Sequence, residues 1–416
     1  MGMRYIIAFT TIISLCVILD VYTWQGLKRT VGRRVFKFFK WFIPLTTFLF
    51  FAGFMISLFR SNNGIHNGHY LLNLVTGFTF GVFIAKLVIA LPFLIEDVIR
   101  FASYILKRFN AQKTDHVKVP SRRKFVRNIA LSVAAIPLAG TIYAITKGKY
   151  RFQVKHITLD FDDLPQEFDG VKVLQFSDFH AGSFDDVNAV REGLALINQQ
   201  KPDIIAFTGD LVNNRSVECA PFEAMFKALK APLGKFAVRG NHDYGDYKPF
   251  LTREEEEENM QNFERTFRDT GFKLLDNEAQ TITKNGKSIH LIGVENWGNP
   301  PFPRYGDLNK ATKGLAKNDF SILLSHDPDH WEHEARFHEK KFHLTLSGHT
   351  HGAQFGVDIP GWKWSPVKYR YKRWLGLYKE DRQYLYVSKG FGFLGFPGRL
   401  GIYPEIVVFE LKKKTV

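Results

Sequence analysis

The chain has 416 residues, of which 45% are hydrophobic, and a formal net charge of +15 at pH 7. Residues 1–150 hold 20 Lys+Arg against 4 Asp+Glu, a balance of +16, whereas the other residues hold 36 against 37, a balance of −1. A nucleic-acid-binding protein would carry its basic residues on a folded domain, so this distribution indicates no nucleic-acid partner and favours a membrane.

Four apolar segments predict that residues 1–148 form a four-span helical membrane region. The segments are 5–24, 38–59, 70–95 and 129–145, and the last is short for a full span. Buried core helices are the alternative, but segments of this length with few charges are rare in soluble cores. Lys86 lies inside the third segment, where we expect it to reach the interface or to pair with Glu96 or Asp97.

Basic residues gather in the first and third connections between these segments, around 28–37 and 100–127. Loops rich in Lys and Arg stay in the cytoplasm, so the chain after the fourth span is predicted to lie outside it. The stretch SRRKFV at 121–126 is similar to a twin-arginine export signal. An ordinary basic flank is the alternative, and both interpretations give the same orientation.

The sequence pattern of residues 149–416 predicts a second domain, of the α/β class. Short apolar runs end in turn residues and read as buried strands. Five of them matter most, at 171–176, 204–207, 236–238, 322–324 and 342–346. Helical patterns lie between them, so polar residues that follow the strands are expected to gather at one edge of the sheet structure.

Each of the five runs leads into a short polar motif: SDFH, TGD, RGNHD, SHD and SGHTH. The polar residues in these motifs are Asp178, His180, Asp210, Asn241, His242, Asp243, His326, His349 and His351. Carboxylate, amide and imidazole groups without thiolates suit divalent manganese, iron or zinc. Residues i and i+2 at a strand end point to the same side, so Asp-x-His and His-x-His can each approach one site.

The ordered motifs resemble the calcineurin-like metallophosphoesterase family from about residue 157 onward. The extension HTHGAQ and the closing RLGIYPEIVVFEL resemble its membrane-anchored bacterial branch, which is phosphodiesterase-like and linked to twin-arginine export. The resemblance implies a four-layer α/β/β/α domain and two divalent metal ions, manganese, iron or zinc. Ala353 departs from the pattern, since close relatives often have Gly there.

The same resemblance assigns a role to each site residue. It implies that one metal ion is held by Asp178, His180 and His351, that the other is held by Asn241, His326 and His349, and that Asp210 bridges them. His242 would be a catalytic residue near the leaving group. Apart from the resemblance, we expect Asp243 to orient His242, with a turn-stabilising role as the alternative.

We therefore predict a multi-pass protein of the bacterial cell membrane with an extracytoplasmic phosphoesterase domain. It would hydrolyse a phosphodiester, pyrophosphate or phosphomonoester by attack of a metal-bridged hydroxide, and a lipid-linked or envelope phosphoester is one option for the substrate. One alternative is a cytoplasm-facing pyrophosphatase of a nucleotide-linked lipid A precursor. Another is a non-catalytic, metal-dependent envelope-binding protein.

Further stretches bear on the substrate. Residues 361–378 interleave aromatic and basic residues, which suits a lipid headgroup interface, with a decorated hairpin as the alternative. The apolar glycine-rich stretch 391–401 is expected to flank the site, and an exposed apolar patch there would favour a lipid substrate. Arg215 and Arg399 are candidates for phosphate contact, with a surface position as the alternative. Three histidines on a polar stretch are expected to be exposed, namely His330, His333 and His338.

Overall fold

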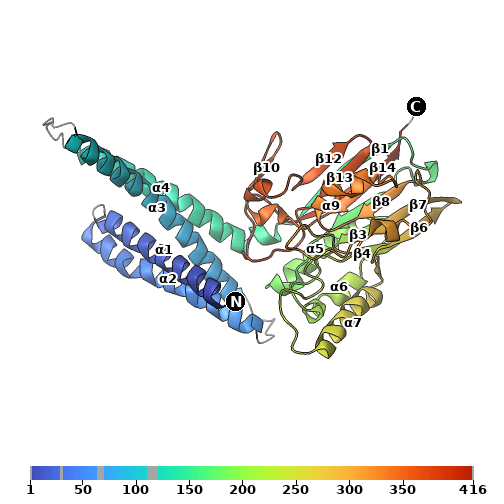
Figure 1. Cartoon of the computed structure of the whole chain (residues 1–416), viewed down its shortest axis with the longest axis horizontal. Coiled ribbons are helices and arrows are strands. Elements are labelled where there is room, and N and C mark those ends of the chain that lie inside the picture. The colour runs from blue at the N-terminus through green and yellow to red at the C-terminus, as the bar shows by residue number, and fades with distance from the viewer. Residues whose placement is uncertain (1, 29–30, 63–69, 110–119, 415–416) are drawn as a thin grey trace. The chain divides into compact units, whose positions relative to one another are not determined.

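The computed structural model describes residues 2–28, 31–62, 70–109 and 120–414 (Figure 1). They divide into two compact units, one that ends at Ile145 and one that begins at Thr146 apart from a few residues near Tyr70. Part of the predicted third basic connection, residues 110–119, lies outside the described residues.

The first unit is helical, with α1 at Gly2–Lys28, α2 at Arg33–Asn62, α3 at Tyr70–Phe109 and α4 at Pro120–Thr146. By length and composition, two stretches of the described helices qualify as membrane spans, Arg33–Ile56 in α2 and Leu71–Leu106 in α3. A shorter apolar helical stretch covers Ser132–Thr146 in α4. Large apolar side chains such as Trp41 and Leu71, each 72% exposed, lie on the outside of these helices, as expected where lipid is the solvent.

Lys86 differs from the prediction. Its ammonium group donates to Asp20 Oδ1 at 2.8 Å, to the Ile43 carbonyl at 2.9 Å and to Thr47 Oγ1 at 2.8 Å, and the side chain is buried. The partner is thus an acid on α1 instead of Glu96 or Asp97. A buried cation inside a helical bundle needs such partners because water is absent there.

The second unit contains two six-stranded sheets (Figure 1). The first has the order β1-β14-β2-β3-β4-β5, with β2 to β5 parallel. Its strands are β1 Gln153–Phe161, β14 Glu405–Lys413, β2 Lys172–Phe176, β3 Ile204–Thr208, β4 Lys235–Val238 and β5 Lys273–Leu274. The C-terminal strand β14 lies between β1 and β2, parallel to the first and antiparallel to the second.

The second sheet has the order β12-β13-β9-β8-β7-β6, in which β13, β9, β8 and β7 run parallel. Its strands are β12 Gly376–Glu380, β13 Gln383–Val387, β9 Leu344–Ser347, β8 Ser321–Leu324, β7 Lys287–Gly293 and β6 Glu278–Lys284. A separate two-stranded ribbon pairs β10 Val357–Ile359 with β11 Trp362–Trp364.

Helices cover the outer face of both sheets. On the first sheet, Ile205 and Phe207 of β3 pack in one apolar cluster with residues of α5 Val187–Gln199, α6 Glu223–Lys227 and α7 Arg253–Asp269. On the second sheet, outer residues pack with α8 Leu308–Ala311 and α9 Pro328–His333. A third cluster joins the inner faces, for example Ile204 of β3 and Leu324 of β8. This arrangement confirms the predicted four-layer α/β/β/α domain.

The five predicted site-bearing strands are β2, β3, β4, β8 and β9, three in one sheet and two in the other. Every residue of β3 is buried, because both faces of its sheet are covered. This is why each strand appears in the sequence as an unbroken apolar run. The loops that follow the five strands meet at one end of the sandwich, where the backbone of Asp178 donates to Gly209 and that of Ser325 to Leu346.

Candidate metal centre

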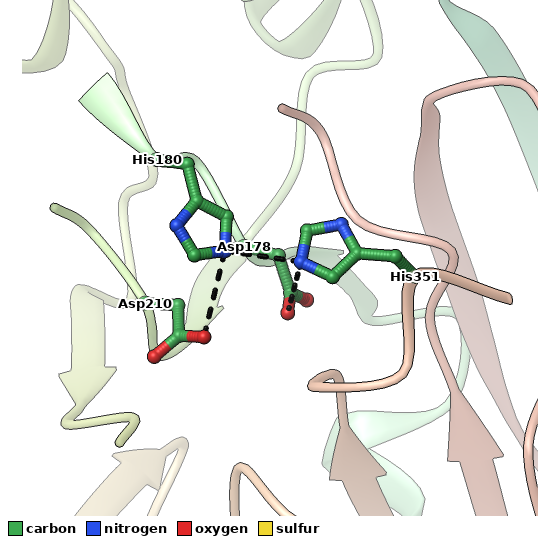
Figure 2. Close-up of side chains that lie close together, drawn as sticks. All are labelled: Asp178, His180, Asp210 and His351. Atoms are coloured by element: carbon green, nitrogen blue, oxygen red, sulfur yellow. Dashed lines mark hydrogen bonds and ion pairs between the residues drawn. The ribbon is translucent and has the colours of Figure 1, made fainter. Parts of the chain in front are cut away.

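All seven predicted metal-binding side chains lie in the loops after β2, β3, β4, β8 and β9, and the structure brings them together in two groups that share Asp210. In the first group, Asp178, His180, Asp210 and His351 offer ligand atoms that all lie within 4.8 Å of one another. Figure 2 shows the imidazoles of His180 and His351 and the two carboxylates directed toward a common point.

The distances within the first group are short. Nε2 of His180 lies 3.0 Å from Nε2 of His351 and 3.5 Å from Asp210 Oδ2. Nε2 of His351 lies 3.4 Å from Asp178 Oδ1. These donor atoms therefore converge from three loops that are far apart in the sequence.

The second group joins Asp210, His326 and His349, again within 4.8 Å, and Asn241 lies beside it. Nε2 of His326 lies 3.1 Å from Asp210 Oδ2. Nδ1 of His349 lies 3.3 Å from Nε2 of His326 and 2.7 Å from Oδ1 of Asn241. The carboxylate of Asp210 thus reaches both groups with the same oxygen.

These residues fit divalent cations. The second carboxylate oxygen of Asp178, Oδ2, is buried and has no hydrogen-bond partner among the described residues, although buried polar atoms are nearly always paired. Two imidazole nitrogens that face each other at 3.0 Å beside two carboxylates form a set of lone pairs that a cation would satisfy. Asp178 Oδ1 accepts the backbone N–H of His349 at 2.8 Å and is also the oxygen that lies 3.4 Å from Nε2 of His351, so the loop after β9 fixes the carboxylate at the centre.

Other atoms fix the orientation of the imidazoles. Nδ1 of His326 lies 2.7 Å from the carbonyl of Thr208, and Nδ1 of His180 lies 3.1 Å from Oδ1 of Asn213. When Nδ1–H donates to an oxygen, Nε2 keeps its lone pair for a metal. His349 is turned the other way, because its Nε2 lies 2.8 Å from Oη of Tyr371 and its Nδ1 faces the centre.

Burial and neighbouring charges shift the pKa values of the site residues in different directions. Burial lowers the pKa of His180 and of His349 to about 3, which keeps both in the neutral form that binds metal. Burial also lowers the pKa of His326, but the Asp210 carboxylate outweighs it and raises that pKa to about 10. Burial raises the pKa of Asp178 to about 6. A cation that binds at His326 must therefore displace a proton.

The backbone at the site is strained. Five of the seven predicted ligands have φ between 49° and 72°, namely Asp178, His180, Asp210, His349 and His351. Such left-handed values are uncommon outside glycine and concentrate at functional sites. Ala353 also has a positive φ, 52°, so the glycine that is usual at this position would be less strained there. Gly348 is needed for space, since a Cβ there would lie 2.2 Å from Asp178 Oδ2.

His242 lies beside the two groups. Its imidazole centroid is 5.0 Å from that of His180, and its backbone N–H donates to Asp210 Oδ1 at 2.9 Å. Nδ1 lies 2.8 Å from the carbonyl of Asn213, so Nδ1–H donates there and Nε2 is the nitrogen left for proton transfer. The side chain is half-buried, unlike the metal-facing His180.

Asp243 lies in a different environment from the one predicted for a residue that orients His242. Its carboxylate accepts backbone N–H groups from Asp210, Leu211 and Gly240 at 2.8–2.9 Å. This supports the turn-stabilising alternative, because the carboxylate ties the loop after β3 to the loop after β4.

Both arginines predicted to contact phosphate, or to lie on the surface, are buried. Arg215 donates to the carbonyls of Gly245 and Lys248 and stacks on the ring of Phe250 at 3.7 Å. Arg399 donates to the carbonyl of Gly392, and its Nη2 lies 3.1 Å from Nδ1 of His351. The guanidinium groups are thus engaged in holding loops at the centre.

Two further expectations are corrected by burial. His330 is completely buried, with Nδ1 2.7 Å from Ser325 Oγ and its ring stacked on Trp297, whereas His333 is exposed as predicted and His338 is half-buried. Phe391 and Phe393 belong to the apolar core beneath the first sheet, so the stretch 391–401 does not present them as an exposed patch.

Three site residues were missed in the sequence: Asn213, Tyr247 and Tyr371. Asn213 and Tyr371 contact predicted ligands or His242, and Tyr247 accepts from Asn241 Nδ2 at 2.8 Å and lies against His242. Asn213 and Tyr247 follow the motifs TGD and GNHD by a few residues, which is a weak signal for a second layer of contacts. Tyr371 comes from a distant segment that no local pattern connects to the site.

Comparisons with known proteins identify the family of both parts of the chain. A family model described as calcineurin-like phosphoesterase matches residues 171–353, and a model described as "Probable Calcineurin-like phosphoesterase, transmembrane domain" matches residues 3–149. The uncharacterized metallophosphoesterase YkuE of Bacillus subtilis (strain 168) is 30% identical over 304 residues, which cover 71% of this chain and 99% of the relative.

Two other relatives are similar over much of the chain. Phosphodiesterase YaeI of Escherichia coli (strain K12) is 28% identical over 299 residues, 70% of this chain and 99% of the relative. A transmembrane protein with metallophosphoesterase domain from Danio rerio is 25% identical over 293 residues, 68% of this chain and 62% of the relative.

Proposed function

The chain belongs to the calcineurin-like metallophosphoesterase family and is a membrane-associated phosphoester hydrolase, and from this premise we propose that its centre holds two divalent cations and cleaves a phosphodiester. The same metal-assisted hydrolysis applies to a pyrophosphate or a phosphomonoester, which are the alternative substrates. The observation that carries the proposal is the position of Asp210, whose Oδ2 lies 3.5 Å from Nε2 of His180 and 3.1 Å from Nε2 of His326.

The ligand sets follow from this position. Asp178, His180 and His351 would hold one cation, Asn241, His326 and His349 the other, and Asp210 both. When bound, manganese, iron or zinc ions would supply Lewis acidity toward the phosphoryl oxygens and a hydroxide nucleophile at neutral pH. The buried carboxylates of Asp178 and Asp210 would offset the charge of the cations.

His242 would act on the leaving group. Because Nδ1–H donates to the carbonyl of Asn213, the proton that a leaving oxygen needs would be held at Nε2. A protonated imidazole there would also stabilise negative charge that develops on the phosphoryl group. Asn213 would position two imidazoles at once, since its side-chain Oδ1 lies beside His180 and its carbonyl beside His242.

The enzyme domain is proposed to comprise residues 149–416 and to face away from the cytoplasm, behind a four-span region at 1–148. The excess of Lys and Arg in the first and third connections supports this orientation. Reporter fusions after Lys149 test this orientation. A fusion to alkaline phosphatase, which is active outside the cytoplasm, is expected to show activity. Activity of a fusion to a reporter that works only in the cytoplasm would overturn the orientation.

A substrate screen tests the activity. Full-length protein in detergent is to be loaded with Mn²⁺ and assayed on bis-p-nitrophenyl phosphate and p-nitrophenyl phosphate, with metal content measured on the same sample. We expect faster turnover of the diester and its loss in Asp210→Asn, while Asp381→Asn, an exposed acid on the turn between β12 and β13, serves as the matched control. Metal-loaded protein that cleaves the monoester alone would refute the diesterase assignment.

A further inference from the structure

The β10–β11 ribbon has an unusual distribution of polar and apolar side chains. It forms a two-stranded sheet of its own and extends from the second unit beside the larger sheets (Figure 1). Ile359 pairs with Trp362 and Val357 with Trp364, so these four side chains share one face of the ribbon. Asp358 and Lys363 pair on the other face.

The polar face is the one fastened to the body of the domain. Asp358 forms an ion pair with Lys389 at 2.7 Å, and the side chain of Lys389 is 8% exposed. On the apolar face, Ile359 is 52% and Trp362 57% exposed. A free-standing ribbon in water would be expected to turn its apolar face inward, so this one is oriented as if it had an apolar partner outside the domain.

Three further exposed residues lie next to the ribbon in the sequence. Phe355 is 48% and Tyr369 77% exposed, and Lys368 is exposed beside Tyr369. We call the set Phe355, Ile359, Trp362, Lys368 and Tyr369 the ribbon surface. The segment 355–378 that contains it has five basic residues and one acidic residue. Aromatic rings with interspersed Lys and Arg are the side chains that favour the boundary between lipid headgroups and acyl chains.

The ribbon and the first residues of the second unit contact the same loop. Helix α4 ends at Thr146, and the segment that follows packs on the loop after β13: Tyr150 contacts Phe393, Phe152 contacts Phe391 at 4.4 Å and Arg151 stacks on Tyr403 at 4.5 Å. The same loop holds the base of the ribbon, because Gln354 Nε2 donates to the carbonyl of Phe396 at 2.8 Å and Gly356 N to that of Leu400 at 3.0 Å.

We propose that the ribbon surface docks on the anionic surface of the bilayer in which the helices of the same chain are anchored. The helices hold the second unit at a high effective concentration next to lipid, so modest contacts suffice for docking. The excess of basic residues favours anionic lipid over a second copy of the chain, which would bring like charges together. Docking would also place the metal centre near the lipid, since Ser365 Oγ after β11 donates to the carbonyl of Gly352 beside His351 at 2.7 Å.

The test uses the full-length protein in lipid nanodiscs. Cysteine is introduced by Trp362→Cys and labelled with an environment-sensitive fluorophore. The two native cysteines, Cys16 and Cys219, are buried, so the label reacts mainly with the introduced thiol. The matched control is Lys287→Cys, an exposed position at the start of β7, at the end of the sheet opposite the metal loops. Quenching by nitroxide-labelled lipid is then measured in discs with and without phosphatidylglycerol.

We expect a blue-shifted emission and quenching at position 362 in the anionic discs, weaker quenching in neutral discs, and neither at position 287. Lys368→Gln should lower the docked-to-undocked ratio about fivefold, because one basic side chain near an anionic leaflet contributes about 1 kcal/mol. Equal quenching at both labelled positions would overturn the proposal. So would a blue shift at position 362 without quenching by the labelled lipid, because the surface would then be covered by protein.

Discussion

Replacement of Tyr371 by Phe tests how the second group of ligands is held. Tyr371 is 6% exposed, and its Oη lies 2.8 Å from Nε2 of His349. If Nε2–H donates to this oxygen, Nδ1 keeps its lone pair, and Nδ1 is the nitrogen that lies 2.7 Å from Oδ1 of Asn241. Tyr371→Phe removes the acceptor and leaves the ring in place.

The expected magnitude follows from this geometry. Loss of a neutral hydrogen bond alone costs about 0.5–1.5 kcal/mol. Partners that orient metal-binding histidines are worth about 10–100-fold in metal affinity, which corresponds to about 1.4–2.8 kcal/mol. We expect a loss in the second range, because the imidazole of His349 is also free to rotate or change tautomer once the acceptor is gone.

The assay is calorimetric titration of the metal-free, full-length protein with Mn²⁺. Tyr371→Phe should weaken one binding event about 10–100-fold and leave the other unchanged. Turnover should recover at high Mn²⁺, which a general folding defect would not allow. Tyr378→Phe is the matched control, because its hydroxyl accepts from the backbone of Trp374 and Leu375 in the same segment. Unchanged affinity in Tyr371→Phe, or an equal loss in both variants, would refute the reasoning.

Three further predictions concern the same centre. His242→Ala should keep its bound metal by elemental analysis but lose turnover about a hundredfold or more, and intact turnover would end the proposed role. Asp243→Ala should lower the free energy of unfolding by about 1–3 kcal/mol, measured by denaturant titration, because buried backbone N–H groups lose their acceptor; an unchanged stability would contradict this. Because the pKa of His326 is raised to about 10 in the metal-free protein, binding at pH 7 should release a proton and affinity should rise with pH. Calorimetry in two buffers of different ionisation enthalpy measures this, and identical heats would exclude proton release.

The buried strands and the residues that follow them could be predicted from the sequence because both signals are local. A run such as 204–208 is apolar throughout since its sheet is covered on both faces, and Gly209 and Asp210 mark where it ends. The ligand atoms then converge because strands of the same direction end at the same edge. Five short motifs in the sequence were therefore enough to locate the centre.

Burial of long polar side chains could not be predicted in this way. No local pattern predicts that the guanidinium groups of Arg215 and Arg399 are buried, because the carbonyls of Gly245, Lys248 and Gly392 that accept from them lie 7 to 33 positions away along the chain. His330 sits in a polar stretch, and only tertiary contact with Trp297 and Ser325 removes it from water. Predictions from periodicity fail where such long-range contacts decide the environment.

The position of β14 has a consequence for the biogenesis of the protein. The first strand after the membrane helices, β1, is an edge strand whose neighbour in the sheet is β14, which begins at Glu405. The first strand after the membrane helices therefore gains its backbone partner only after residues 405–413 have been synthesised. Until then the enzyme domain lacks the strand that joins β1 to β2, so its first sheet is completed only after the four helices and the five site-bearing strands have been synthesised.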